Sequence, residues 1–279
     1  MGNISIVILN YLNYKDTIEC IESIFKMRYD LDGIVIVDND SQNESYSVLK
    51  KRYKRTKNII IVKANSNYGF AKGNNIGIKI ARQRFGSEFI FVVNNDTIFV
   101  QEKYFKNLLN KYRPGVGIIG SEIHLKNNTT QEEVSHDISL RGSLNTLFCK
   151  YLAKYDKRIW SFLLPKVSKR YMVNVLHGCA LLFTPDFFKY YSGFYDRTFL
   201  YSEEPILYLM CKRRGLKQIY DDSTYIFHKE DQSSEMSFQN NLKVRYSYQC
   251  QSYKYLVWWI MKDKISDMFK RILSDKSKY

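Results

Sequence analysis

The first half of the chain alternates short, apolar, β-rich runs with amphipathic helical patterns, and this alternation restricts the fold more than any other feature. The apolar runs cover 5–9, 33–37, 58–62 and 88–93. The helical patterns cover 17–27, 46–54, 73–85 and 102–112. Near-continuous apolar strands separated by helices predict an α/β domain whose mostly parallel sheet is covered on both faces. In such a sheet, ligands bind beyond the carboxyl ends of the strands.

The second half is less regular. A polar loop is expected at 126–133, and residues 141–170 are basic and aromatic without clear periodicity, which predicts a mobile insertion. An apolar run at 173–183 begins a second compact block. Helical patterns follow at 185–191 and 205–214, then a polar loop at 229–237, and the tail beyond this loop is helical. We therefore expect one domain over 1–235, in two parts at 1–125 and 171–235, and a basic amphipathic tail over 236–279.

Composition narrows the class of protein. The 43 Lys and Arg against 28 Asp and Glu give a net charge of +15, which favours anionic partners such as nucleotide phosphates, lipid phosphates or nucleic acid. The five cysteines have no zinc or disulfide spacing, which fits a reducing cytoplasm. We expect neither an export signal nor a membrane span, because the run at 255–261 is far shorter than the roughly 20 apolar residues required.

The second apolar run ends in Asp38, which places a carboxylate at the expected carboxyl edge of the sheet. One interpretation is structural, because Ser41 and Glu44 have capping-box spacing and would begin the next helix. That interpretation leaves Asp38 without a partner. Its carboxylate could accept a hydrogen bond from the imide N–H of a pyrimidine base.

The third run leads into a glycine-containing segment at 65–77. Its glycines are four residues apart, so it does not match the dinucleotide-binding G-x-G-x-x-G pattern. Gly73 and Gly77 could simply allow a helix to pack closely on the sheet. Alternatively, backbone N–H groups at the start of a helix, with Lys72 nearby, would suit a diphosphate.

The fourth run ends in three polar residues at 94–96, Asn-Asn-Asp, where a simple turn would need fewer. One carboxylate with amide oxygens nearby can hold Mg²⁺ or Mn²⁺, which keeps water and phosphate ligands. His228 ends a later β-like run, and its neutral imidazole could complete such a site, although a lone histidine is more often structural. His124, His136 and His177 stand in no comparable context.

Two adjacent acids, Glu203 and Glu204, follow an aromatic run and precede Pro205. Acids beside a proline are typical of a helix N-terminus. The aromatic run should also pack the acids inward, where one carboxylate could have a raised pKa and act as a general base.

Taken in order, these segments resemble a family-2 glycosyltransferase with the GT-A fold, of the rhamnosyltransferase-like branch that builds bacterial cell-surface polysaccharides. The resemblance covers about residues 4–230. Its motifs are SIVILNY at 5–11, VDNDS at 37–41, NYGFAKGNN at 67–75, NND at 94–96, and GFYD at 193–196 leading to FLYSEE at 199–204. It implies a Rossmann-like, mostly parallel sheet flanked by helices, with a helical C-terminal extension. It also makes 1–125 the nucleotide-sugar half and 171–235 the acceptor and catalytic half.

The resemblance also implies site residues. In that family the Asp38 position contacts the nucleotide base, and the segment around 67–75 lines the nucleotide-sugar pocket. The nucleotide-sugar site would therefore comprise Asn10, Asp38, Asn67, Gly69, Phe70, Lys72, Gly73, Asn74 and Asn95. Asp96 stands at the metal-binding position of the DXD element, and with His228 it would hold Mn²⁺ or Mg²⁺. The first two positions of this element are Asn, so only Asp96 supplies charge.

The family's acid pair is usually Glu-Asp, and its second residue lies at the position of the catalytic base. Here that residue is Glu204, which has one more methylene, and Glu203 would orient it or act electrostatically. An acid usual two positions later is Ile206, and the Arg-Asn pair that commonly follows a tyrosine cluster is altered at 245–251. The implied reaction is direct displacement at the anomeric carbon of a UDP- or dTDP-sugar, with inversion of configuration.

A lipid-linked saccharide acceptor and an anionic membrane surface would explain the basic charge. We therefore expect a cytoplasmic protein that associates peripherally with the inner face of the plasma membrane. The tail places apolar residues at three- and four-residue steps, so it either packs on the catalytic domain or lies in the membrane interface. These residues are Trp258, Met261, Ile265, Met268, Phe269 and Ile272.

Two other functions compete with this interpretation. The departures at Ile206 and in the tail would suit a catalytically weak sugar-nucleotide-binding protein. The charge and the 23 tyrosines would suit a nucleic-acid-binding protein, but no RNA- or DNA-binding motif is present. We therefore expect no nucleic-acid partner.

Overall fold

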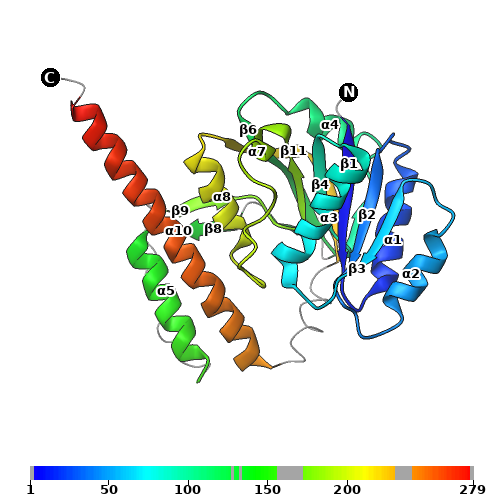
Figure 1. Ribbon diagram of the computed structural model, residues 1–279, viewed down its shortest axis with the longest axis horizontal. Helices are drawn as coiled ribbons and strands as arrows, with labels where there is room; N and C mark the ends of the chain where they lie inside the picture. Colours follow the sequence, from blue (N-terminus) through cyan, green and yellow to red (C-terminus); the bar gives the residue numbers. More distant parts are fainter. Residues whose placement is uncertain (1–2, 127–128, 132–133, 156–171, 230–240, 277–279) are drawn as a thin grey trace.

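The structure is a computed structural model that describes residues 3–126, 129–131, 134–155, 172–229 and 241–276. A nine-stranded sheet forms its centre, with the order β3-β2-β1-β4-β10-β6-β11-β5 and with β7 paired to β6 (Figure 1). All pairs among β1 to β4 are parallel, as is the pair of β6 and β11, whereas β10 runs antiparallel to both of its neighbours. The predicted α/β fold with a mostly parallel sheet is confirmed.

The four strands expected in the first half are all present. They are β1 (Ile4–Asn10), β2 (Gly33–Asp38), β3 (Ile59–Lys63) and β4 (Phe89–Asn94). The four helices are also present, as α1 (Tyr14–Lys26), α2 (Ser45–Tyr53), α3 (Gly69–Phe85) and α4 (Tyr104–Asn110). Helix α3 begins one turn earlier than its pattern predicts. The segment expected to be a nucleotide-binding loop is therefore the first turn of this helix.

The apolar side chains form two layers, one on each face of the sheet. One layer joins the sheet to α1, α2 and α4 through buried residues such as Ile21, Leu49 and Phe105. The other joins it to α3, to α7 (Pro185–Phe188), to α8 (Glu203–Arg213) and to the C-terminal helix. Burial on both faces explains why the strands read as continuous apolar runs.

The second half adds strands to the same sheet. These are β5 (Thr97–Phe99), β6 (Val116–Leu125), β7 (Thr130–Gln131), β10 (Ala180–Phe183) and β11 (Lys217–His228). Strand β10 lies between β4 and β6, and the Asn94 backbone N–H donates to the Cys179 carbonyl at 2.8 Å. Because β10 pairs directly with β4, Cys179 and the residues just before it lie beside the polar end of β4.

The expectation of an aperiodic, mobile insertion is wrong for residues 141–153. They belong to α5 (Leu140–Ala153), which follows a small antiparallel pair, β8 (Val134–Asp137) and β9 (Met172–Val175). The Ser139 hydroxyl caps this helix by accepting from the Gly142 N–H at 2.9 Å. Because α5 buries only a narrow stripe, its apolar periodicity is weak. Residues 156–171 lie outside the described part of the chain.

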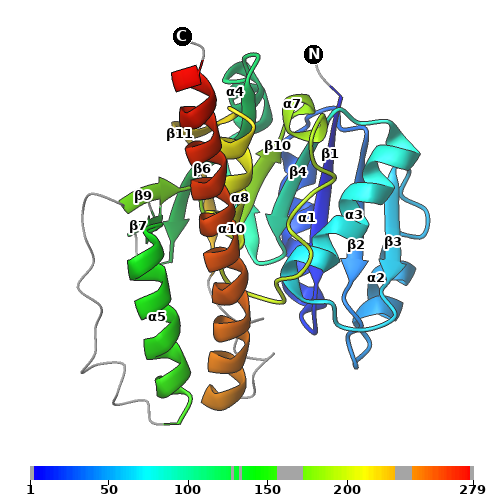
Figure 2. The ribbon, with the colours of Figure 1, turned by 60° about the vertical axis from the view of Figure 1, so that its left-hand side comes forward.

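The helical tail is confirmed as α10 (Leu242–Lys276), which runs beside α5 and across α8 (Figures 1 and 2). Leu256, Trp259 and Ile260 are buried in the core that α10 shares with α8. The tail is therefore packed on the α/β domain, which agrees with one of its two interpretations. The polar loop expected at 229–237 lies almost wholly outside the described residues.

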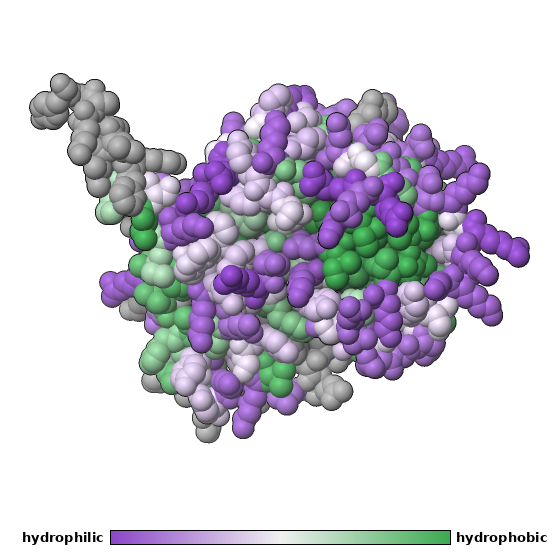
Figure 3. All heavy atoms as spheres, viewed as in Figure 1, coloured by the Kyte–Doolittle hydropathy of each residue, from purple (hydrophilic) through white to green (hydrophobic). Residues whose placement is uncertain are grey.

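One side of α10 nevertheless remains exposed. Trp258, Met261, Ile265 and Met268 are each at least 40 % exposed, and apolar side chains gather along this helix at the left of Figure 3. The side chains of Phe269 and Ile272 lie outside the described ones. Among the helices that the structure describes, none combines the length and apolar character that a membrane crossing requires.

Candidate active site

A pocket of about 440 Å³ opens at the carboxyl ends of β1, β2, β4 and β11, where the parallel fold predicts ligand binding. Eight of the thirteen predicted site residues line it. They are Asn67, Gly69, Phe70, Asn95, Asp96, Glu203, Glu204 and His228. The structure therefore brings together the start of α3, the end of β4, the start of α8 and the end of β11.

The metal-binding expectation rests on Asp96 and His228, and the structure places them in contact. Asp96 Oδ1 lies 3.2 Å from His228 Nε2, both side chains are buried, and Asn94 Nδ2 lies 3.5 Å from the same nitrogen. His228 Nδ1 is buried and has no partner within the described structure. A carboxylate and an imidazole suit a divalent cation whose remaining ligands come from substrate and water. No group of three or more such ligands occurs among the described residues.

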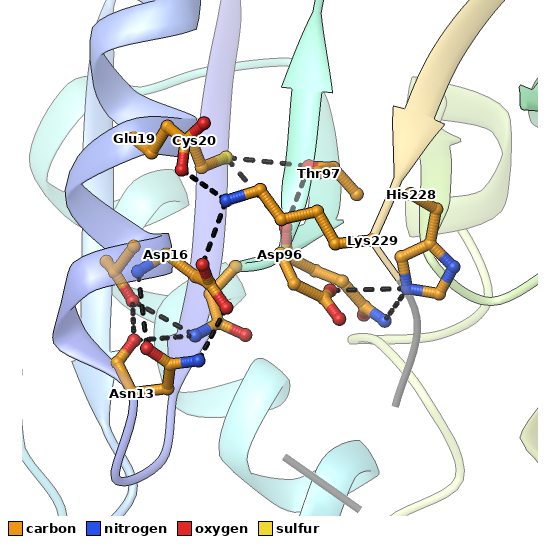
Figure 4. A network of polar contacts seen from close by, with 11 residues as sticks. Asn13, Asp16, Glu19, Cys20, Asp96, Thr97, His228 and Lys229 are labelled. Atoms are coloured by element: carbon orange, nitrogen blue, oxygen red, sulfur yellow. Dashed lines mark hydrogen bonds and ion pairs between the residues drawn. The ribbon is translucent and has the colours of Figure 1, made fainter. Parts of the chain in front are cut away.

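A polar network holds this pair in place. Lys229 Nζ donates to Asp16 Oδ1 at 2.9 Å and to Glu19, both on α1, and its backbone N–H donates to the Asp96 carbonyl at 3.0 Å (Figure 4). Asn95 is tied to the same helix, because its amide donates to Thr17 Oγ1 at 3.1 Å. Helix α1 is thus linked to the turn that carries Asp96 and to the end of the strand that carries His228.

The two predicted acids begin α8, as the proline pattern requires, and they differ in environment. Glu203 is buried, and burial followed by the nearby Glu204 carboxylate raises the pKa of Glu203 to about 8. Glu203 Oε1 has no hydrogen-bond partner in the described structure. Glu203 therefore keeps its proton at neutral pH, so the pair bears less charge than its formal two.

Gly178 provides space for the longer side chain of Glu204. A methyl group at position 178 would lie 2.7 Å from Glu204 Oε1, so no other residue fits there without moving the carboxylate. Cys179 follows Gly178, and the carboxylates of both Asp96 and Glu204 act on its thiol. Burial, followed by the Asp96 and Glu204 carboxylates, raises the pKa of the Cys179 thiol well above its ordinary value.

The loop before the acids is fastened to the start of α3. The Phe70 N–H donates to the Phe199 carbonyl at 2.7 Å, and Gly69 adopts a positive φ of 74° where any side chain would collide with that carbonyl. The Tyr68 N–H donates to Asn39 Oδ1, and the Gly69 N–H donates to Asn67 Oδ1. These three N–H groups already have acceptors within the protein, and a diphosphate site at this helix start stays a prediction.

Five of the predicted nucleotide-sugar residues do not line the pocket. Asn10 and Asp38 are buried beneath it, where Asp38 accepts from Asn10 Nδ2 at 2.8 Å and from the Ser41 N–H at 3.0 Å. The capping-box interpretation of Ser41 is wrong, because its hydroxyl accepts from the Leu12 N–H and Glu44 caps α2 without a side-chain bond. Base recognition by Asp38 stays a prediction.

The other three belong to α3. Lys72 is exposed, with Nζ 4.1 Å from the centre of the Tyr68 ring. Gly73 allows the helix to approach Leu9 on β1, as the structural interpretation required. The Asn74 amide donates to the Phe70 carbonyl at 3.0 Å within the helix. None of the three lines the pocket.

Several pocket residues escaped the sequence reasoning. His136, His177, Lys150, Gln249 and Tyr253 line the side formed by β8, α5, α10 and the segment before β10. His136 and His177, for which the sequence offered no context comparable to that of His228, line the same pocket as His228. No local motif marks these residues, because α5 and α10 reach the pocket through long-range packing. Asn39, which also lines the pocket, stood inside a quoted motif and could have been found there.

The fold is of the GT-A type found in glycosyltransferases. Residues 5–185 match glycosyl transferase family 2, and the chain belongs to that family. The solved structure of the mannosyltransferase PcManGT from Pyrobaculum calidifontis, in complex with GDP-Man and Mn²⁺, superposes with a TM-score of 0.56 at 10 % identity, over 99 % of this chain and 80 % of that one. S. aureus TarS superposes with a TM-score of 0.53 at 12 % identity, over 82 % of this chain and 37 % of that one.

A curated relative is glycosyltransferase GlyG of Streptococcus pneumoniae serotype 4. It is 29 % identical over 105 residues, which is 38 % of this chain. The match spans about a third of that protein's length, at 33 %. The structural neighbours support the fold, and the family match supports a glycosyltransferase activity.

Proposed function

We propose that this protein is an inverting glycosyltransferase in which Glu204 is the general base. One observation carries the proposal: the Glu204 carboxylate, beside Gly178, lines the same pocket as Asp96 and His228. Glu204 takes the proton of the acceptor hydroxyl while the acceptor oxygen bonds to the anomeric carbon. The bond from that carbon to the nucleoside diphosphate breaks, and the configuration inverts.

The donor is a nucleoside-diphosphate sugar, with UDP- and dTDP-sugars as the first candidates. Asp96 and His228 would hold Mn²⁺ or Mg²⁺, which neutralises charge on the departing diphosphate. The Mn²⁺ and GDP-Man in the PcManGT structure support a divalent cation and leave a GDP-sugar open as a third donor. Asn95 and Asn67 line the donor side of the pocket.

The decisive experiment separates chemistry from donor binding. Glu204→Gln should lower kcat by about 10²- to 10⁴-fold and leave nucleoside-diphosphate affinity within twofold of wild type, because a positioned base acts only in the reaction. Asp96→Ala should instead abolish the Mn²⁺ dependence of nucleotide binding in a calorimetric titration. Unchanged turnover in Glu204→Gln, with loss in Glu203→Gln, would reverse the two roles. Donor binding without any transfer would favour a sugar-nucleotide-binding protein.

We further propose a lipid-linked saccharide acceptor in bacterial surface-polysaccharide synthesis, within the rhamnosyltransferase-like branch, and a peripheral position at the inner face of the plasma membrane. The exposed apolar side of α10 supports the membrane contact. Lysines flank it, with Lys262 Nζ 4.6 Å from the Trp258 ring centre. Such a basic amphipathic face is typical of a helix that lies in an anionic membrane interface.

Point substitutions test the membrane contact better than truncation, because Leu256 and Trp259 are buried and their loss would unfold the domain. The double variant Met261→Ser, Ile265→Ser should lose sedimentation with vesicles of phosphatidylglycerol and phosphatidylcholine and keep its melting temperature. A matched control is Phe25→Ser on α1, where the phenylalanine is also about half exposed. Equal sedimentation of the double variant and wild type would contradict the proposal.

A further inference from the structure

The sheet ends in β3, which among the described strands pairs with β2 alone. Just beyond the two ends of β3, the Asn58 carbonyl accepts from β2 and the Ala64 N–H donates to β2, each at 2.8 Å. Successive residues of a strand direct their N–H and C=O groups to opposite sides, so the even-numbered residues of β3 bond to β2. The N–H and C=O groups of Ile59, Ile61 and Lys63 therefore point outward from the edge of the sheet.

The edge strand is apolar on both faces. All four residues at 59–62 are half-buried. The odd-numbered two pack on the core layer that includes α1 and α2, and the even-numbered two pack on the layer that includes α3. Figure 3 shows an apolar patch at the right of centre, where Figure 1 places β3 and the facing side of α3, with hydrophilic side chains around it. An apolar patch with a polar rim is typical of a surface that binds another molecule.

A basic segment precedes this edge. Residues 50–57 contain six Lys and Arg and no Asp or Glu, and all six are exposed. Among the described residues, Arg52 alone of the six forms an ion pair, with Glu22 on α1. Lys63 adds a positive charge at the other end of β3, with Nζ 3.7 Å from Asp40 Oδ1. The edge therefore presents an apolar centre between positive ends.

The charge and the backbone groups together select the kind of occupant. A second copy of this chain would bring like charges together, because an antiparallel pair centred on Ile60 sets Lys57 opposite Lys63. A lipid surface would leave the outward N–H and C=O groups without partners in hydrocarbon, which is costly. An extended protein segment with acidic side chains satisfies both the backbone groups and the basic rim.

We propose that β3 is a docking edge for an extended, acidic segment of a partner protein, which adds a strand to the sheet. The backbone of that segment bonds to Ile59, Ile61 and Lys63, and its apolar side chains lie beside Ile60 and Val62. Its carboxylates face the basic residues at 50–57. This inference goes beyond the proposed transfer reaction and does not depend on it, since no residue of β3 lines the pocket.

The test uses the whole chain and a defined probe, a blocked peptide of alternating glutamate and valine with about ten residues, the length of a long strand. This peptide should bind wild type in a calorimetric titration at low salt, and a matched peptide of alternating lysine and valine should not. At saturation, amide hydrogen exchange at Ile59, Ile61 and Lys63 should slow by at least about tenfold, because these amides gain acceptors. Ile60 and Val62 should exchange slowly already, since they bond to β2.

One substitution removes an outward donor and no bond to β2. Ile61→Pro should weaken binding of the glutamate peptide by at least about tenfold, because proline lacks the N–H and is tolerated on an edge strand when that N–H faces outward. The matched control is Ile61→Val, which keeps the N–H and should bind within about twofold of wild type.

A charge reversal tests the rim separately, and it decides the question if Ile61→Pro lowers the melting temperature. The double variant Lys54→Glu, Lys57→Glu should bind the glutamate peptide about 3- to 30-fold more weakly at low salt and should bind the lysine peptide. The matched control is Lys103→Glu, Lys106→Glu, two exposed lysines at the start of α4, which packs on β6 and β11 far from β3 in the strand order. It should bind both peptides as wild type does.

The inference is overturned if wild type does not bind the glutamate peptide, or if a folded Ile61→Pro binds it as tightly as wild type. Binding without slower exchange at the outward amides would also overturn it, because charge attraction alone would then explain the titration. A dimer that protects these amides in the absence of peptide would make a second copy the occupant instead.

Discussion

Gly178→Ala tests the position of the proposed base more sharply than removal of the base does. The added methyl group would lie 2.7 Å from Glu204 Oε1 and 3.4 Å from Cδ, and ordinary contact begins near 3.4 Å. The carboxylate must therefore move by about 0.7 Å. A displacement near 1 Å at a reacting group can lower a rate by about 10²-fold. We expect kcat to fall by about 10- to 100-fold, which corresponds to about 1.4–2.7 kcal/mol of barrier.

The assay is steady-state transfer, paired with calorimetric titration of the nucleoside diphosphate. Donor affinity should stay within twofold, because the nearest atoms to the added methyl group all belong to Glu204. Glu204→Asp supplies the control, since its shorter side chain withdraws from position 178. The double variant Gly178→Ala, Glu204→Asp should be more active than the product of the two single losses predicts.

Two results would refute this reasoning. If Gly178→Ala turns over as wild type does, the carboxylate is not held against position 178 during the reaction. If the losses of the two single variants simply multiply in the double variant, the methyl group acts by some route other than the Glu204 side chain. The first result would also weaken the assignment of Glu204 as the base.

Three further predictions concern neighbouring groups. The pKa of Glu203 is raised from 4.5 to about 8, so the folded protein keeps a proton on Glu203 that the unfolded chain releases at lower pH. The free energy of unfolding should therefore fall by up to about 1.4 kcal/mol per pH unit between about pH 5 and 8, and Glu203→Gln should flatten this slope in urea melts. Lys229→Met, which frees Asp16, should weaken Mn²⁺-dependent nucleotide binding by about 3- to 10-fold, whereas Lys189→Met, remote from the pocket, should not. Cys179, whose pKa burial raises, should resist iodoacetamide at pH 8 in a mass-spectrometric assay although it lines the pocket, and rapid alkylation of the folded protein would contradict this.

The sheet could be predicted from the sequence because its signals are local. Each strand from β1 to β4 is a run of apolar residues, and each ends in a polar side chain at the same edge. Parallel strands bring those ends together whatever the rest of the chain does, so Asn95 and Asp96 reach the pocket as predicted. His228 reaches it by the same rule, since β11 runs parallel to β6, whereas the acid pair stands at the start of helix α8.

Other features could not be predicted because they depend on how a hydrogen-bonding group is used by distant residues. The N–H groups at the start of α3 looked available for a phosphate, but Asn39 and Phe199 occupy two of them. Asp38 looked available for a base, but Asn10 reaches it from the neighbouring strand. A sequence shows which donors and acceptors exist, and only the packing decides which of them remain for a ligand.

The tail contributes to the candidate site, because Gln249 and Tyr253 of α10 line the pocket. The Ser252 hydroxyl on α10 donates to the Leu200 carbonyl at 2.8 Å, and Tyr248 stacks on Phe199 with ring centres 4.3 Å apart. Leu200 and Phe199 belong to the loop that presents Glu203 and Glu204, and the Phe199 carbonyl also accepts from the start of α3. One loop is thus held on one side by α3 and on the other by α10. A membrane contact on the exposed side of α10 would therefore act on the helix that holds the loop before the acids, since Ser252 precedes Met261 by nine residues, about two and a half turns of helix.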